Sequence, residues 1–242
     1  MSPVANVCAC GEYFHVDDTG ELCLNKGTMG LRRMVQFSTP GTAKFRKADY
    51  PWLARVRVKV QAGGGGSAGA DAAAKQLIAR PGGSGGGYAE SLIEVGALAD
   101  VESVVIGAGG AGGIGNNPGA PGGASSFGGT VTAIGGNPGT DGMTSGTSNT
   151  TSNGISAPSS GAGQITSGGG PGEGALRMAM RGMSGRGGDS WLGFGGYGRT
   201  TSGPGGTSRG RGGGAGGAFS SDGKSYDGGA GGNGIVIIEL FG

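Results

Sequence analysis

The chain has 242 residues, of which 64 are glycine and 10 are proline, and it carries a formal net charge of +2. Glycine at about four times its usual share of roughly 7% approaches low-complexity composition, but no strict Gly-X-Y register runs along the chain, which excludes collagen. Charged residues make up only 14%, which excludes the strongly charged type of disordered protein, and the chain has no run of 18 apolar residues that could insert into a membrane.

Residues 1–35 form a small leading unit, which we expect to be an attachment or oligomerisation segment. Apolar stretches in EYFHVDD and ELCLN flank Thr19-Gly20, and this pattern predicts a β-hairpin. About 35 residues are too few to fold alone without a metal or a partner chain. The first residues, MSPVANVCACGEYF, lack a basic region followed by an apolar core, so we expect synthesis in the cytosol without a secretory signal.

The cysteines and the single histidine all lie in this leading unit, in the order Cys8, Cys10, His15 and Cys23. Thiolates and imidazole are zinc ligands, but the spacing C-x-C-x4-H-x7-C lacks the usual C-x2-C knuckle. Small buried thiols in a strand pair are the simpler interpretation, and thiols that meet across a symmetric oligomer are a third. These four residues are therefore weak metal candidates, and we expect no cofactor.

Residues 36–242 form the main domain, which opens with the clearest strand of the sequence. Val56, Val58 and Val60 alternate with Arg55, Arg57, Lys59 and Gln61, so one face should be buried and the other solvated. Trp52, after Pro51, should anchor the entry to this strand as part of the core.

The next segments alternate between glycine runs and apolar stretches. Asp71 is placed to cap a short helix that Pro81-Gly82 would end. The segments YAESLIEV and VESVVIGA should be strands joined by a turn near Gly96-Ala97, SSFGGTVTAIGG should be a hairpin, and GIVIIELFG should be a closing strand. About six strands would then carry the core.

The stretch ESVVIGAGGAGG, from Glu102 to Gly113, matches the dinucleotide-binding pattern G-x-G-x-x-G. That site needs a helix after the glycines and an acidic residue about 20 positions on. The residues that follow Gly113 are rich in glycine and proline, and no Asp or Glu occurs between Glu102 and Asp141. A second match, Gly223-Lys224-Ser225, lacks the preceding glycine of a P-loop and should be a polar turn.

The glycine runs have two interpretations, flexible loops and close packing of backbone, and the fold that we expect rests on the second. Extended helices with three residues per turn, of the polyproline II type, can stack only where small residues face inward. Glycine recurs every three residues at 107, 110 and 113, then at 119 and 122, and a second register holds 109, 112 and 115. Main-chain groups would then bond between neighbouring helices.

These patterns together predict an all-β fold. Strand periodicity of two dominates, and nearly all the glycine lies between the strands. We expect a small β-sandwich or roll as the base, stacked glycine-rich polyproline-II-like helices above it with long loops, and the N-terminal hairpin as the attachment segment.

The order of five blocks resembles a family of glycine-rich phage tail proteins, including tail-fibre tip adhesins with a polyglycine-sandwich domain. The blocks are FRKADYPWLARVRVKVQAGGGG, GGGYAESLIEV, SVVIGAGGAGG, GGASSFGG and GGAGGNGIVIIELFG. The resemblance covers roughly residues 36–242 and implies a β base, stacked glycine helices, and loops at the far end that touch a host surface. It also implies a homotrimer, although the sequence itself has no heptad pattern that would indicate one. The cysteine-bearing segment departs from most relatives.

Two stretches between Ala133 and Asp227 are candidates for a binding surface. GMTSGTSNTTSNGISAPSSG, within the region 140–170, should be an exposed loop. ALRMAMRGMSGRGGDSWLGFGGYGR combines arginines with aromatic rings, which suits sugar rings and anionic polymers, although the rings could simply cover glycine backbone. Leu176, Met178 and Met180 alternate with Arg177 and Arg181, which indicates a half-buried strand. The receptor-binding candidates are Arg177, Arg181, Arg186, Trp191, Phe194, Tyr197 and Arg199.

The chain should not be an enzyme, because it has no paired carboxylates, no G-x-S-x-G elbow and only one histidine. The first hypothesis is a virion tail or fibre protein that binds a bacterial surface glycan or polymer and attaches to other tail or capsid proteins through residues 1–35. The second is a structural decoration or fibre subunit without receptor binding. The third, suggested by GRGG and SRGRGGG, is an RNA-binding protein of the RGG type, against which the small net charge argues.

Overall fold

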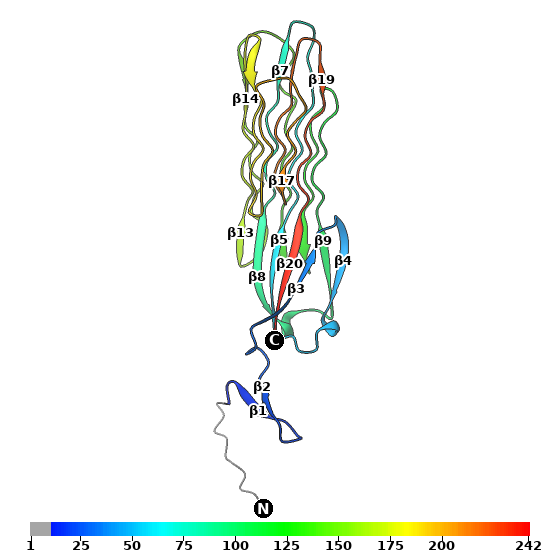
Figure 1. Ribbon diagram of the computed structural model, residues 1–242, viewed down its shortest axis with the longest axis vertical. Helices are drawn as coiled ribbons and strands as arrows, with labels where there is room; N and C mark the ends of the chain where they lie inside the picture. The colour runs from blue at the N-terminus through cyan, green and yellow to red at the C-terminus, as the bar shows by residue number, and fades with distance from the viewer. Residues whose placement is uncertain (1–10) are drawn as a thin grey trace, which may run out of the picture.

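The computed structural model describes residues 11–242, in which two antiparallel sheets form the base of an elongated domain (Figure 1). Strands of the two sheets enclose the main hydrophobic core, and several of them continue upward into extended glycine-rich segments. The first sheet has the order β13 (Ile165–Ser167), β8 (Tyr88–Glu94), β5 (Arg55–Gln61), β20 (Ile235–Phe241) and β3 (Leu31–Phe37). The second has the order β11 (Val131–Ala133), β10 (Ser125–Phe127), β9 (Val101–Ile106) and β4 (Gly41–Arg46).

Strand β5 lies at the centre of the five-stranded sheet, and its apolar residues form the middle of the core. Val56, Val58 and Val60 are fully buried, which confirms the alternation read from the sequence. Trp52 is partly buried and packs against the same core. Gln61 was expected on the solvated face but is also fully buried, because its amide nitrogen donates to the carbonyls of Gly86 and Gly87 at 2.9 Å where the glycine layer closes over it.

The predicted strands of the main domain are otherwise confirmed. Strands β8 and β9 are separated by the single 3-10 turn η2 (Val95–Ala97), β10 and β11 form a hairpin, and β20 closes the chain. The other 3-10 turn, η1 (Lys47–Asp49), follows β4. None of the helices in residues 11–242 is long and apolar enough to cross a membrane.

A separate hairpin extends below the base (Figure 1). Strands β1 (Phe14–Val16) and β2 (Leu22–Leu24) pair antiparallel, as the sequence predicts. The domain boundary expected at residues 35 and 36 falls inside β3, because β3 pairs along β20 and so belongs to the base sheet. The leading unit therefore ends before Leu31.

The prediction of a short helix after Asp71 is wrong. Residues 70–79 instead form β6 (Ala70–Asp71), a turn in which Lys75 has a φ of 58°, and β7 (Leu77–Ala79). Each strand pairs with a remote one: β6 with β19 (Ser225–Tyr226) and β7 with β18 (Phe219–Ser221). These pairings override the local helix propensity of DAAAKQLIA.

The glycine-rich segments between base and far end are extended, and their backbone partners recur every three residues. Residues 62–69 lie at the centre, surrounded by six other segments. Groups three positions apart bond to the same neighbour, which is the period of a polyproline II helix. N–H groups donate in pairs from Gly63 and Gly66 to Gly123 and Ala120, from Gly64 and Ser67 to Gly232 and Gly229, and from Ala62 and Gly65 to Gly87 and Ser84.

The glycines after β9 belong to this layer, so ESVVIGAGGAGG is not a nucleotide site of the Rossmann type. Residues 107–124 contain no helix. One glycine register of the sequence accepts hydrogen bonds from the segment that leads into β20, again in steps of three. The carbonyls of Gly107, Gly110 and Gly113 accept the N–H groups of Gly234, Gly231 and Gly228 at 2.8–2.9 Å.

Close backbone contact is the reason for glycine in the second register. A Cβ added at Gly109 or Gly112 would lie 2.0 Å from the carbonyl oxygen of Gly231 or Gly228, respectively. The fold class is thus the expected one: an all-β sandwich base continued by a close-packed glycine layer.

Candidate functional site

The end of the bundle farthest from the C-terminus and the N-terminal hairpin is built from turns that come from distant parts of the chain (Figure 1). We call this end the tip. Besides β6, β7, β18 and β19, it contains a small sheet of order β12 (Thr150–Ser152), β14 (Ala175–Met178) and β15 (Arg181–Met183). The stretch 142–161, expected to be an exposed loop, contributes β12 to this sheet and buries the side chains of Met143 and Ile155. Strand β13, which follows this stretch, joins the base sheet.

An open hollow of about 630 Å³ lies at the tip, and we call it the tip hollow. Three separate segments form it: the β14–β15 turn, the turn at residues 200–202, and β18 with the turn that leads to β19. The aromatic ring of Phe219 is buried and belongs to a small apolar cluster with Leu77 and Met143, so it forms a fixed floor. The lining comprises Met180, Arg181, Gly182, Thr200, Thr201, Ser202, Phe219, Ser221 and Lys224.

Backbone and hydroxyl hydrogen bonds hold two of these segments together. The N–H of Gly203 donates to the carbonyl of Phe219 at 2.8 Å, and the N–H of Phe219 donates back at 3.1 Å. The hydroxyls of Ser202 and Ser221 lie 2.8 Å apart. The hydroxyl of Ser220 donates to the carbonyl of Lys224, which fixes the turn that bears this lysine.

The charged side chains of the tip hollow are both cationic. Arg181 and Lys224 line it, and no carboxylate does. Within residues 11–242, neither side chain forms a salt bridge or a hydrogen bond that would neutralise it. The hollow is therefore a positively charged, hydroxyl-rich surface open to solvent.

Of the seven receptor-binding candidates, Arg177 is the one that the structure removes from the surface. Its side chain is only 5% exposed, and its guanidinium donates to the carbonyls of Leu77, Thr144 and Ser148 at 2.6–2.8 Å. Side chains do alternate along β14, but the arginine is on the buried face and the methionine on the exposed face: Met178 is 55% exposed. The neighbouring loops present backbone carbonyls that need hydrogen-bond donors. A buried guanidinium supplies those donors and a thioether does not, so burying the arginine is the more stable arrangement.

The aromatic candidates lie outside the tip hollow. Trp191 precedes β16 (Gly193–Phe194), which pairs with β17 (Arg209–Gly210), and its ring stacks on Tyr88 of the base with centroids 5.3 Å apart. The other face of the Trp191 ring is open to solvent, and the residue is 66% exposed. Phe194 and Tyr197 are also well exposed and stand three residues apart, so a three-residue repeat places them on one side of their segment.

Two further candidates are engaged by neighbours. Arg186 forms a salt bridge with Asp189 at 2.8 Å. Arg199 lies over the ring of Tyr197, donates to its hydroxyl at 2.9 Å, and also donates to the carbonyl of Pro204. The predicted cluster is thus spread along the bundle, and Arg181 alone of its members lines the tip hollow.

The other residues of the hollow were missed as site residues by sequence reasoning. Gly223-Lys224-Ser225 was correctly interpreted as a turn, since Asp222 and Gly223 have φ values of 56° and 72°, but the turn presents Lys224 to the hollow. Thr200, Thr201 and Ser202 follow Arg199 directly in the sequence, and this cluster of hydroxyl groups is the one signal that could have marked them.

The structure places two of the four metal candidates. Cys8 and Cys10 lie outside the described residues, while His15 and Cys23 face each other in register across the β1–β2 hairpin. The His15 ring bonds to the Asn25 side chain at 2.9 Å, and the thiol of Cys23 donates to Asp17. From Gly11 onward, no group of three or more metal-ligating side chains is close enough to hold an ion.

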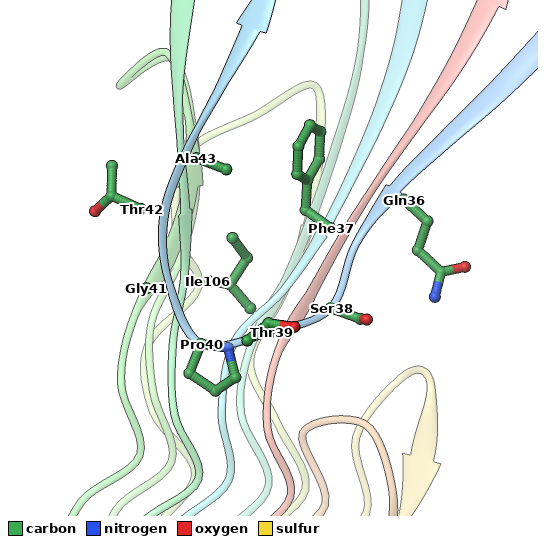
Figure 2. A pocket seen from close by; sticks show the side chains of 9 residues that line it. All are labelled: Gln36, Phe37, Ser38, Thr39, Pro40, Gly41, Thr42, Ala43 and Ile106. Carbon is green, nitrogen blue, oxygen red and sulfur yellow. The ribbon is translucent and has the colours of Figure 1, made fainter.

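A second hollow lies at the junction of the base and the glycine layer, where the turn at residues 38–40 joins β3 to β4. Figure 2 shows Phe37, Ala43 and Ile106 on the inner side of the turn, with Gln36 and Thr42 pointing away. Its volume is about 340 Å³, and its lining has no charged side chain. It therefore offers shape but no charge for ligand recognition.

Tyr88 gives the base a predicted sensitivity to alkali. Burial first, and then the hydrogen bond from its hydroxyl to Glu90, raise its pKa well above the ordinary value of 10.0. Below pH 10 the tyrosine is neutral in both folded and unfolded chains. Above pH 10 only the unfolded chain releases this proton, so the free energy of unfolding should fall by up to about 1.4 kcal/mol per pH unit.

Urea denaturation between pH 9 and pH 11.5 measures this loss. The Tyr88→Phe variant should lose stability less steeply above pH 10 than the wild type. Tyr197→Phe, with a half-exposed ring, is the matched control and should retain the wild-type slope. Equal slopes for wild type and Tyr88→Phe would contradict the assignment.

Comparison with known proteins identifies the chain through its glycine-rich part. A family model described as a glycine-rich domain matches residues 41–241, which includes both base sheets except β3 and the entire glycine layer. None of the curated proteins compared with the chain matches it.

Proposed function

The chain belongs to the glycine-rich domain family, and on this premise we propose that it is a tail or fibre component of a virion or phage-like particle that binds the bacterial host surface through its tip. The resemblance of its sequence blocks to glycine-rich phage tail proteins supports its assignment to a virion or phage-like particle. The arrangement of the molecule supports a role in binding the host surface. The protein would act as an adhesin and not as an enzyme.

The observation that carries the proposal is the separation of the two ends. The N-terminal hairpin and the C-terminus lie at the base end of the molecule, and the turns that line the tip hollow lie at the opposite end, with the glycine layer between them (Figure 1). Main-chain hydrogen bonds at three-residue intervals tie each central segment to several neighbours, so the layer is a stiff spacer. A protein mounted by its base would present its turns to whatever the particle meets.

The mount would be the leading unit. Short two-stranded hairpins are marginally stable alone, and β1 and β2 leave Phe14, Val16 and Leu24 exposed. An open hollow of about 570 Å³ next to Lys26, on the same side as the hairpin, offers a second contact area. We propose that this end joins other tail or capsid proteins and copies of the chain, in a homotrimer.

A structural decoration or fibre subunit remains the second candidate, because the hydrogen-bonded glycine layer would resist proteolysis whether or not it binds a receptor. The RNA-binding alternative has less support. Arg186 is paired with Asp189, and Arg211 donates to the carbonyl of Ser38 at 3.0 Å. Both arginines therefore stand in ordered segments and not in an unstructured basic tract of the RGG type.

Binding of the full chain to bacterial cells tests the proposal. All three cysteines lie within the first 23 residues, so a thiol-reactive fluorophore labels the mounting end and leaves the tip free. We expect saturable binding to at least one strain of a bacterial panel, displaced by unlabelled protein. No binding to any strain, together with immunogold labelling along a shaft or capsid of purified particles, would instead establish the structural alternative.

A further inference from the structure

We propose that the tip hollow is a binding site for the anionic group, a carboxylate or a phosphate, of a surface polysaccharide. This inference rests on the proposed function, because it names the ligand class that the tip would recognise. It depends on the charge, hydroxyl groups and rigidity of the hollow.

The two cations of the hollow are of complementary kinds. The guanidinium of Arg181 presents a planar fork of donors that fits the oxygens of a carboxylate or phosphate, and the ammonium of Lys224 supplies a point charge. They come from β15 and from the turn before β19, which are more than 40 residues apart in the sequence. Their meeting at one hollow is therefore a product of the fold.

Nearby acids leave this charge in place. Asp222 stands in the same turn as Lys224, but it does not line the hollow, and its carboxylate accepts the N–H of Lys75 at 3.0 Å. An anionic ligand would thus meet two cations without a competing carboxylate in the lining.

The hydroxyl groups of Thr200, Thr201, Ser202 and Ser221 suit the rest of a sugar. Each hydroxyl can donate and accept, as a sugar hydroxyl does, so the same lining can bond to ring substituents in either sense. Met180 adds an apolar wall that can contact the carbon face of a ring. A lining of cations alone would fit any polyanion, whereas this one favours an anion carried by a saccharide.

Size and rigidity support a specific site. A volume of about 630 Å³ lies within the range of roughly 300–1,000 Å³ typical of small-ligand pockets. The buried floor at Phe219 and the paired hydroxyls of Ser202 and Ser221 hold the frame before a ligand arrives. Because the site is already ordered, binding costs less conformational entropy, which favours affinity. The hollow opens at the end of the bundle, so a polymer chain can enter without cleavage.

Binding to defined polysaccharides tests the inference. Polygalacturonate supplies carboxylates, phosphomannan supplies phosphates, and neutral dextran supplies neither, so the arms also distinguish the two anions. We expect the wild-type chain to bind at least one anionic polymer, and Arg181→Gln/Lys224→Gln to bind it about 100-fold more weakly, since each charge-assisted contact contributes roughly tenfold or more.

A matched double variant separates the hollow from general charge. Lys44→Gln/Arg209→Gln also removes one lysine and one arginine charge, but from exposed positions on β4 and β17 outside the hollow, and this variant should bind like the wild type. Equal weakening by both doubles, or wild-type binding no stronger to the anionic polymers than to dextran, overturns the inference. Circular dichroism checks that both variants are folded.

The same variants keep this inference distinguishable from the adhesin proposal. If Arg181→Gln/Lys224→Gln still binds bacterial cells like the wild type, the hollow is not the recognition site, although the adhesin function stands. If wild-type protein binds no cells yet binds an anionic polymer through the hollow, the site stands and the adhesin proposal fails.

Discussion

Replacing Gly64 by alanine is expected to lower the free energy of unfolding by at least about 3 kcal/mol, the upper end of the usual cost of overpacking. A Cβ at this position would lie 2.1 Å from the carbonyl oxygen of Gly213, 2.4 Å from its carbonyl carbon and 2.6 Å from the carbonyl oxygen of Gly212. These are backbone atoms, so no side chain can rotate away. Residues 62–69 are surrounded by six segments, and a shift on one side creates a clash on another.

Thermal unfolding followed by circular dichroism measures the effect. For a chain of this length, a loss of about 3 kcal/mol lowers Tm by about 6–12 °C. Gly142→Ala is the control, because nothing lies within 4 Å of the position that its methyl group would take and its backbone is outside the left-handed region. That substitution should leave Tm unchanged or raise it slightly. Similar losses in the two variants would show that glycine in the layer is not required for close packing.

Replacing Arg80 by methionine is expected to destabilise the tip by at least about 3 kcal/mol, because four oxygen acceptors lose a charged hydrogen-bond donor. The side chain is only 1% exposed, and burial lowers the pKa of its guanidinium. It has no salt bridge within the described part of the chain, and carbonyl and amide oxygens surround it instead. Its donors reach the carbonyls of Gly69, Asp141 and Met143 and the side-chain oxygen of Asn116 at 2.6–2.8 Å.

The loss should be local as well as global. Methionine fills much of the volume but leaves these oxygens buried without donors, each at a cost of about 1–3 kcal/mol unless water enters. Hydrogen exchange should therefore accelerate in residues 114–117 and 141–146 before it changes in the base. Arg209→Met, at an exposed position, is the control and should alter neither region. Uniform acceleration throughout the protein would contradict a tip-specific role for Arg80.

Arg80 lies where local sequence reasoning failed. In sequence it ends DAAAKQLIAR, which looks like a short helix, and nothing nearby in the sequence indicates four oxygen acceptors. Those acceptors come from segments 11 to 63 positions away, which only the packed bundle brings together. Arg177 and Gln61 are comparable, since each polar group is buried by carbonyls of remote segments.

The sequence by itself determined the elements whose signal is periodic and local. The alternation in β5, the β1–β2 hairpin, the closing strand β20 and the three-residue glycine register all follow from side-chain size and polarity at fixed spacing. Only the tertiary structure decided which polar side chains are buried, where Trp191 and Phe194 lie, and that Arg181 and Lys224 share a hollow. The physical reason is that an extended glycine segment satisfies its backbone almost entirely through segments remote in sequence, so the neighbours of any residue depend on how the whole bundle assembles.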